Sequence, residues 1–235
     1  MNLTDLLRTD GGVLSVVGSG GKSTLVSELA RELGCTVIIA TSTHMLAPQG
    51  CPLLLDATVL DIEQALWYAR VVCVGNRAPG ADGTAGKLRA PSLGFGTLAA
   101  LADHVLVEAD GARRLPLKAH AAHEPVVPTE SRQTIQVVGA SGFGGSVGEV
   151  VHRSQLMCEA VGCSAGDACT PELYARLVAT EHAAGVVRAD DIVVNQADDQ
   201  HGIELAARFA AMLRACGDKV PVAAGSIREH RLKRV

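Results

Sequence analysis

The sequence predicts an α/β fold with three layers, in which a mostly parallel sheet is covered by helices on both faces. Two observations carry this prediction. Short aliphatic runs alternate with longer amphipathic segments along the 235 residues, which is the pattern of strands connected by helices. Several of the aliphatic runs are apolar at consecutive positions, as expected for parallel strands covered on both faces.

The elements follow one another along a single predicted domain over residues 1–235. Two stretches rich in glycine, proline and charge, residues 75–96 and 111–132, are expected as irregular loops, which in compact domains are often functional. The predicted strands are Val13–Val17, Thr36–Ala40, Pro52–Leu55, Val71–Val74, His104–Val107, Thr134–Val138, Ile192–Val194 and Val220–Ala223. The predicted helices are Lys22–Leu33, Thr58–Ala69, Pro171–Ala184 and Gly202–Cys216.

Composition limits both the core and the partners. The chain is 48% hydrophobic but has only one Trp, two Tyr and three Phe, so we expect an aliphatic core. A formal net charge of −4 provides no global field that attracts nucleic acid or an anionic membrane. No signal peptide or membrane-spanning run is visible, and the seven irregularly spaced cysteines are typical of reduced thiols, which predicts a cytoplasmic protein. The spacing of Cys158, Cys163 and Cys169 does not match short zinc-binding motifs.

The first predicted strand runs into a glycine turn and then into a helix, which is the pattern of a phosphate-binding loop. Glycines let backbone N–H groups turn inward around phosphate oxygens, and the helix N-terminus adds partial positive charge. The lysine of such a loop contacts the β- and γ-phosphates, and the following hydroxyl ligates Mg²⁺. The spacing G-x-x-G-K-S is shorter than the usual G-x-x-x-x-G-K-[ST] and is similar to that of the Mur ligases, which activate carboxylates with ATP. The predicted phosphate-binding residues are Gly18, Ser19, Gly20, Gly21, Lys22, Ser23 and Thr24.

Polar residues also follow two further strands, at the edge where open α/β sheets bind ligands. Thr41 and Thr43 are candidates for contact with Mg²⁺ or the γ-phosphate, although a polar turn explains either of them equally well. Glu108 and Asp110 lie two residues apart and so face the same side if the strand continues. A carboxylate opposite the lysine is needed to hold Mg²⁺ and to orient a nucleophilic water. The predicted catalytic residues are Lys22, Glu108 and Asp110, and the predicted Mg²⁺ ligands are Ser23, Glu108 and Asp110.

A basic loop follows these carboxylates. Arg113, Arg114 and Lys118 are candidates to clamp phosphates, to stabilise transferred charge or to bind a second, anionic substrate. Solvent-exposed loop charge is an equally good interpretation. A second basic run, Arg228–Arg234, is expected to be a solvated tail.

The motif Asn-x-x-Asp after the strand Ile192–Val194 predicts recognition of a nucleotide base. In GTPases the Asp accepts from the ring N–H and amino group of guanine, and the Asn fixes the loop. Adenine would leave Asp198 without those donors, at a cost of about 1–3 kcal/mol, which favours GTP. Gln196 stands where GTPases have Lys, so ATP stays an alternative. The predicted base-contacting residues are Asn195, Asp198, Gly225 and Ser226.

Taken together and in order, these motifs resemble the YqeC family. The matching segments are residues 16–24, 41–45, 107–114, 116–118, 123–128, 151–153 and 195–198. The resemblance implies a P-loop nucleotide-binding accessory protein in the maturation of selenium-dependent molybdenum hydroxylases, with such a hydroxylase or its cofactor intermediate as partner. The Glu-x-Asp-Gly strand end is also similar to that of GTPases that insert nickel or cobalamin, which is an analogy of fold.

Three functions remain open from the sequence. The leading hypothesis is Mg²⁺-dependent hydrolysis of GTP or ATP that drives maturation of a partner enzyme. The second is an ATP-dependent transferase or ligase that acts on a small anionic substrate. The third is a nucleotide-gated adaptor that does not hydrolyse.

Overall fold

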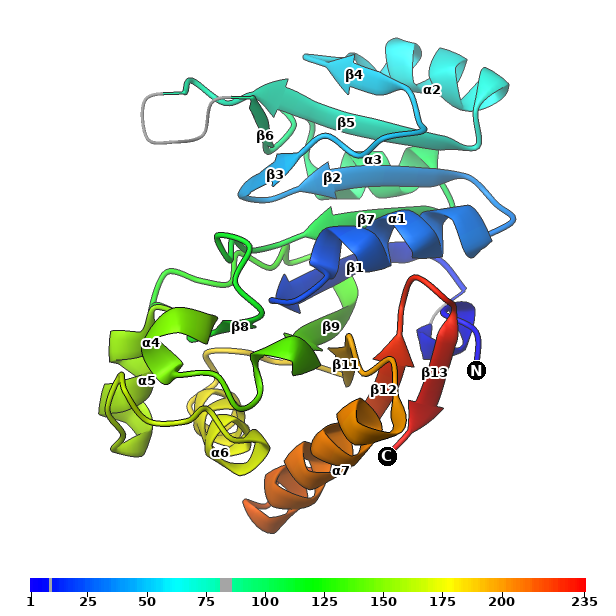
Figure 1. Ribbon diagram of the computed structural model, residues 1–235. Coiled ribbons are helices and arrows are strands. Elements are labelled where there is room, and N and C mark those ends of the chain that lie inside the picture. The colour runs from blue at the N-terminus through cyan, green and yellow to red at the C-terminus, as the bar shows by residue number, and fades with distance from the viewer. Residues whose placement is uncertain (9, 81–85) are drawn as a thin grey trace.

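The computed structural model describes residues 1–8, 10–80 and 86–235 (Figure 1). Within these residues eleven strands form one sheet in the order β13-β12-β11-β9-β1-β7-β2-β5-β6-β3, with β4 paired to β5, and β8 and β10 form a separate pair. The strands are β1 Gly12–Gly18, β2 Val37–Thr41, β3 His44–Leu46, β4 Leu53–Leu55, β5 Val71–Arg77, β6 Lys87–Arg89, β7 His104–Glu108, β8 Leu117–Lys118, β9 Ser131–Gly139, β10 Val151–His152, β11 Asp191–Asn195, β12 Val222–Ser226 and β13 Arg231–Arg234. The α-helices are α1 Lys22–Glu32, α2 Val59–Tyr68, α3 Phe95–Leu101, α4 Val147–Val150, α5 Ser154–Val161, α6 Pro171–Ala183 and α7 Gln200–Ala215.

The centre of the sheet is parallel. β1 lies between β7 and β9 and is parallel to both, and parallel pairing continues outward to β12 on one side and to β5 and β4 on the other. Antiparallel pairs occur only toward the edges of the described sheet, where β13 pairs with β12 and β6 pairs with β5 and β3. The carboxyl ends of the parallel strands therefore meet at one edge, which is where the polar motifs were predicted to gather.

Consecutive residues of the central strands pack on opposite faces of the sheet. Leu14 and Val16 of β1 belong to the core cluster that includes α1, whereas Val13 packs in the cluster that includes residues of α2 and α3. On the other half of the sheet, Val194 packs with residues of α6 and α7, and its neighbour Val193 packs with the α1 cluster. Figure 1 shows the resulting layers, with α1 on one face of the sheet and α3 on the other. The predicted α/β class with helices on both faces is confirmed.

The two stretches expected as irregular contain regular elements. Residues 75–96 include the end of β5, the strand β6 and the start of α3, while residues 81–85 lie outside the described residues. Residues 111–132 include β8 and the first residues of β9. The basic run at the C-terminus is not a tail, because Arg231–Arg234 pairs with β12 as β13 and only Leu232 of that strand is buried. The strands that the prediction missed in these segments, β6, β8 and β13, have only two to four residues, so their hydrophobic pattern is too short to recognise.

Within the described residues no helix is both long enough and apolar enough to cross a bilayer. All seven cysteines are free thiols, and Cys158 and Cys163 lie with their sulfurs 3.8 Å apart. No cluster of three or more His, Cys, Asp or Glu side chains suited to a metal ion occurs in the described part of the chain.

Candidate functional site

The glycine turn between β1 and α1 adopts a conformation that needs glycine. Gly18, Gly20 and Gly21 have φ angles of 91°, 79° and 136°, in the region that side chains disfavour. A side chain at Gly20 would also lie 2.3 Å from the Cα atom of Gly139 at the end of β9. The turn is fixed from behind, since the Gly18 N–H donates to Asp110 Oδ2 (2.8 Å) and the Ser19 N–H donates to the Val137 carbonyl (2.8 Å). The glycine pattern therefore forms a tight turn over residues 18–23, where the sequence predicted phosphate binding, and this segment is here called the phosphate turn.

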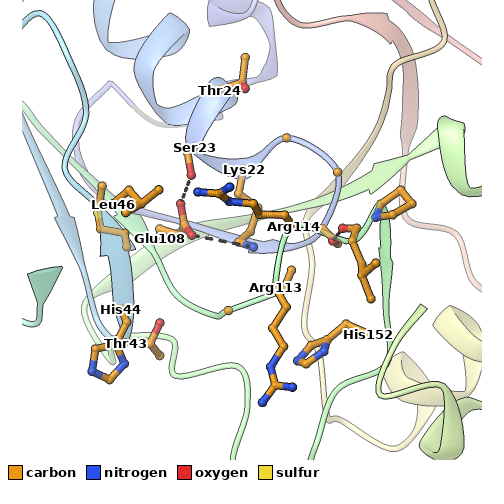
Figure 2. A pocket seen from close by; sticks show the side chains of 18 of the residues that line it. Lys22, Ser23, Thr24, Thr43, His44, Leu46, Glu108, Arg113, Arg114 and His152 are labelled. Carbon is orange, nitrogen blue, oxygen red and sulfur yellow. Dashed lines mark hydrogen bonds and ion pairs between the residues drawn. The ribbon is translucent and has the colours of Figure 1, made fainter. Parts of the chain in front are cut away.

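Lys22, Ser23 and Glu108 lie together at this turn (Figure 2). The Lys22 ammonium donates to the Gly18 carbonyl (2.8 Å) and lies 3.1 Å from Asp110 Oδ1 and 3.9 Å from Glu108 Oε1. The Ser23 hydroxyl donates to Glu108 Oε2 (2.6 Å). Both predicted carboxylates thus approach Lys22, although β7 ends at Glu108, so the two side chains do not share one face of a continuing strand.

Asp110 lies behind Lys22 in the interior, whereas Glu108 lines the cavity. Its side chain is fully buried, and its Oδ2 atom lies 3.1 Å from Lys118 Nζ and 3.0 Å from His120 Nε2. Burial opposes ionisation of this carboxyl, but the charge of Lys22, the hydrogen bond from His120 and the charge of Lys118 outweigh it and hold the Asp110 pKa below its ordinary value. Asp110 is therefore an ionised anchor behind Lys22 and is not part of the cavity lining.

A chain of buried charges extends from Asp110 to α6. His120 contacts Asp110 through Nε2 and Glu181 Oε2 through Nδ1 (2.8 Å). Both ring nitrogens face carboxylate oxygens, which accept hydrogen bonds, so this environment favours the protonated ring. Burial lowers the His120 pKa, but the hydrogen bonds to Asp110 and Glu181 outweigh it and raise that pKa. Neither His120 nor Glu181 was predicted from the sequence. His120 lies two positions after Lys118, and the two-residue alternation of an extended chain is a pattern that points to it. Nothing in the sequence around Glu181 indicates its contact with His120.

Lys118 is also part of this network. It is fully buried, and its ammonium lies 2.6 Å from Glu124 Oε2 and donates to the Gly111 carbonyl (2.6 Å). Glu124 in turn accepts from Arg153, just after β10. Lys118 was predicted as an anion clamp, but the structure places it behind the site with its charge already paired.

Glu108 is the carboxylate that faces the cavity. Burial raises its pKa, the charge of Lys22 and the hydrogen bond from Ser23 oppose that effect, and the neighbouring Asp110 adds to it, with a raised pKa as the net result. Hard oxygen ligands suit Mg²⁺, which usually takes one or two protein ligands and completes its shell with water and phosphate. The Ser23 hydroxyl and the Glu108 carboxylate, in contact at the mouth of the loop, fit such an ion.

Of the two threonines at the carboxyl end of β2, only Thr43 lines the cavity. The hydroxyl of Thr41 is buried, donates to the Glu108 carbonyl (2.7 Å) and accepts from the Thr43 N–H (3.1 Å). The Thr43 hydroxyl is buried at the cavity lining and has no hydrogen-bond partner among the described residues. Thr41 therefore holds the strand end that carries Glu108, and Thr43 offers a free donor.

The cavity in front of the loop has a volume of about 640 Å³ and is strongly basic. Arg113 and Arg114, both exposed, have positive φ angles of 46° and 64°, where the loop turns outward over the cavity. The loop is tied to the phosphate turn, because the Ser19 hydroxyl donates to the Leu115 carbonyl. The polar lining outside the phosphate turn is formed by Thr43, His44, Lys87, Glu108, Arg113, Arg114, Glu124, Ser141, His152, Arg153 and Gln196.

Of the predicted base-contacting residues, Asn195 contacts the phosphate turn, and the other three lie outside the cavity lining. Asn195 at the end of β11 donates to the Gly20 carbonyl (2.8 Å) and accepts from the Ile227 N–H (3.0 Å), so it ties the phosphate turn to the segment after β12. Gly225 and Ser226 are buried at the end of β12, next to β11. Asp198 is exposed and, like Gly225 and Ser226, is not part of the cavity lining.

Comparison with known proteins gives three matches. The sequence model of the family described as YqeC protein matches residues 14–155. The protein YqeC of Escherichia coli (strain K12) is 31% identical over 155 residues, which cover 64% of this chain and 60% of that protein. The crystal structure of the signal recognition particle 54 kDa protein from Aeropyrum pernix K1 in complex with GDP aligns with the whole chain and 46% of its own, at 15% identity and a TM-score of 0.41.

Proposed function

The chain belongs to the YqeC family, and from that premise we propose that it binds and hydrolyses a nucleoside triphosphate with Mg²⁺ to assist maturation of a selenium-dependent molybdenum hydroxylase. One observation carries the proposal: Lys22, Ser23 and Glu108 meet at a glycine turn that opens α1. A lysine, a hydroxyl and a carboxylate at a helix N-terminus form the arrangement that binds a triphosphate with its metal. The matched region covers 60% of the Escherichia coli relative.

In the proposed complex the β- and γ-phosphates lie over the backbone N–H groups of residues 19–23, and the Lys22 ammonium contacts them. Ser23 and Glu108 would hold Mg²⁺, which would supply charge neutralisation at the phosphate oxygens. The Glu108 carboxylate also accepts a hydrogen bond from the attacking water and so orients it. Arg114 stabilises charge on the transferred group. Asp110, with its depressed pKa, keeps Lys22 in place and does not touch the substrate.

The base is proposed to lie at the carboxyl ends of β11 and β12. Asn195 fixes the phosphate turn there through its bond to Gly20, and Asp198 supplies the acceptor that suits guanine, so we propose GTP over ATP. Free thiols are typical of a reducing compartment, which supports the cytoplasm as location.

Phosphate release tests the proposed hydrolysis. The wild-type chain is incubated with Mg·GTP or Mg·ATP, with and without a molybdenum hydroxylase, and all products are identified. We expect free phosphate that the hydroxylase increases, a loss of at least about tenfold in Glu108→Gln, and no change in Glu63→Gln, whose side chain is exposed on α2.

The other outcomes separate the alternatives. A phosphorylated or condensed small molecule would replace hydrolysis by group transfer. Tight nucleotide binding with no turnover under any condition would replace it by a non-hydrolysing adaptor. A Glu108→Gln chain that hydrolyses at the wild-type rate would contradict the assignment of Glu108.

A further inference from the structure

The cavity extends well beyond the phosphate turn. Figure 2 shows that the two adjacent arginines of the loop point in different directions: Arg114 extends toward Ser23 and Glu108, and Arg113 extends away from them, beside His152. Thr43 stands across the cavity from Arg113. This part of the cavity, bounded by Arg113 and His152 on one side and Thr43 on the other, is here called the distal compartment.

The charges of the distal compartment are not balanced by the protein. Glu108 and Glu124 are the acidic side chains in the described cavity lining. Glu108 is bonded to Ser23, and Glu124 is shared between Lys118 and Arg153. Arg113 has no carboxylate partner among the described residues. A guanidinium that lines a cavity and has no carboxylate partner attracts anions.

Two further groups in the compartment are suited to an anion. The Thr43 hydroxyl is buried at the lining with no partner in the described part of the chain, and a buried polar group left so costs about 1–3 kcal/mol. Burial and the charges of Arg153, Lys118 and Arg113 lower the His152 pKa to about 4, so at neutral pH the ring is uncharged and carries one N–H donor. The compartment thus has a guanidinium and a ring nitrogen on one wall and, on the other, Thr43 with its unpartnered hydroxyl.

We propose that the distal compartment is a binding site for a second substrate, a small molecule that carries a phosphate group, next to the nucleotide. The phosphate would be held by Arg113 and His152 on one wall and by Thr43 on the other. Donors that stand on opposite walls suit a tetrahedral oxyanion with several free oxygens better than a planar carboxylate, which presents two. Because the phosphate turn is left to the nucleotide, this assignment rests on the proposed function.

Inorganic phosphate is the probe, titrated into the full chain that is already saturated with Mg²⁺ and a non-hydrolysable GTP analogue. We expect phosphate to bind without displacing the nucleotide, and the His152 pKa, followed by NMR of its ring, to rise as the anion offsets the surrounding cations. Arg113→Ala should weaken phosphate binding at least about tenfold while nucleotide affinity stays within about twofold. The matched control is Arg188→Ala, an exposed arginine away from the cavity, which should change neither.

Phosphate that competes with the nucleotide, or that binds Arg113→Ala as tightly as wild type, would overturn the distal site. Acetate that binds as tightly as phosphate and with the same dependence on Arg113 would overturn its assignment to a phosphate group. A wild-type chain that fails to bind nucleotide would instead contradict the proposed function. Even then, phosphate binding that depends on Arg113 and not on Lys22 would support the distal site.

Discussion

Residues 108–118 contribute charged side chains to two regions, one in which the charges are buried and paired and one in which they are exposed and unpaired. Behind the phosphate turn, Asp110 and Lys118 are fully buried, and each is paired with groups from several elements. At the cavity, Arg113 and Arg114 are exposed and have no carboxylate partner among the described residues. Buried charges are tolerated only when they are paired, whereas a solvated guanidinium can stay free. The first region therefore positions the site, and the second is available to ligands.

The backbone explains how neighbours in sequence reach such different surroundings. The loop turns outward at Arg113 and Arg114, both with positive φ, and returns to the interior at β8. Its two ends are fixed, because Lys118 donates to the Gly111 carbonyl and the Gly139 N–H donates to the Pro116 carbonyl (3.0 Å). The free arginines thus stand on an anchored loop.

The largest expected effect comes from breaking the buried region. Asp110→Asn removes the negative charge that Lys22, Lys118 and His120 share, and breaking a buried ion pair costs about 3–5 kcal/mol. Urea unfolding should show a loss of that order. Asp198→Asn, at an exposed position, should change the free energy of unfolding by less than about 0.5 kcal/mol. Equal stabilities of the two variants would show that the buried ion pairs of Asp110 do not stabilise the fold.

The next effect tests the exposed region. Arg114→Ala should weaken Mg·nucleotide binding by about 10–100-fold, because a charge-assisted hydrogen bond contributes about 1.5–3 kcal/mol. Its free energy of unfolding should stay close to that of wild type, since no carboxylate in the described residues depends on it. Calorimetric titration and urea unfolding on one preparation measure both quantities. A destabilised chain with unchanged affinity would show that Arg114 belongs to the structural region.

A smaller effect concerns the base. Asp198→Asn should reduce the preference for GTP over ATP by about tenfold, because the carboxylate is proposed to accept two guanine donors. Parallel titrations of both nucleotides into wild type and variant measure the ratio. Equal affinities for GTP and ATP in both chains would remove Asp198 from base recognition.

The smallest effect is a pH dependence of stability. The His120 pKa is raised in the folded chain, so its contribution is complete below the unfolded value of about 6.5 and is lost as pH rises through the folded pKa. In that window wild type should lose up to about 1.4 kcal/mol per pH unit relative to His120→Gln. Unfolding curves recorded from pH 6 to pH 9 compare the two chains. Parallel profiles would mean that the ring does not gain a proton on folding.

The sequence predicted the central strands and helices because their hydrophobic patterns are long and strong. The glycine turn and the acidic strand end were also predictable, since the chemistry of phosphate and Mg²⁺ requires those residue types. Which carboxylate faces the cavity was not, because β7 ends at Glu108 and the side chain two residues on lies behind Lys22. The pairing of His120 with Glu181 depends on where α6 packs, which local pattern does not encode.

Equilibrium binding tests the central claim most directly, namely that the turn around Lys22 binds a nucleoside triphosphate. Mg·GTP and Mg·ATP are titrated into wild type, Lys22→Ala and Lys219→Ala. Lys219 is an exposed lysine between α7 and β12 and serves as the control. Circular dichroism verifies that each chain is folded. We predict that Lys22→Ala lowers affinity by at least about a hundredfold and that Lys219→Ala leaves it unchanged. A folded Lys22→Ala chain that binds either nucleotide as tightly as wild type would contradict the account.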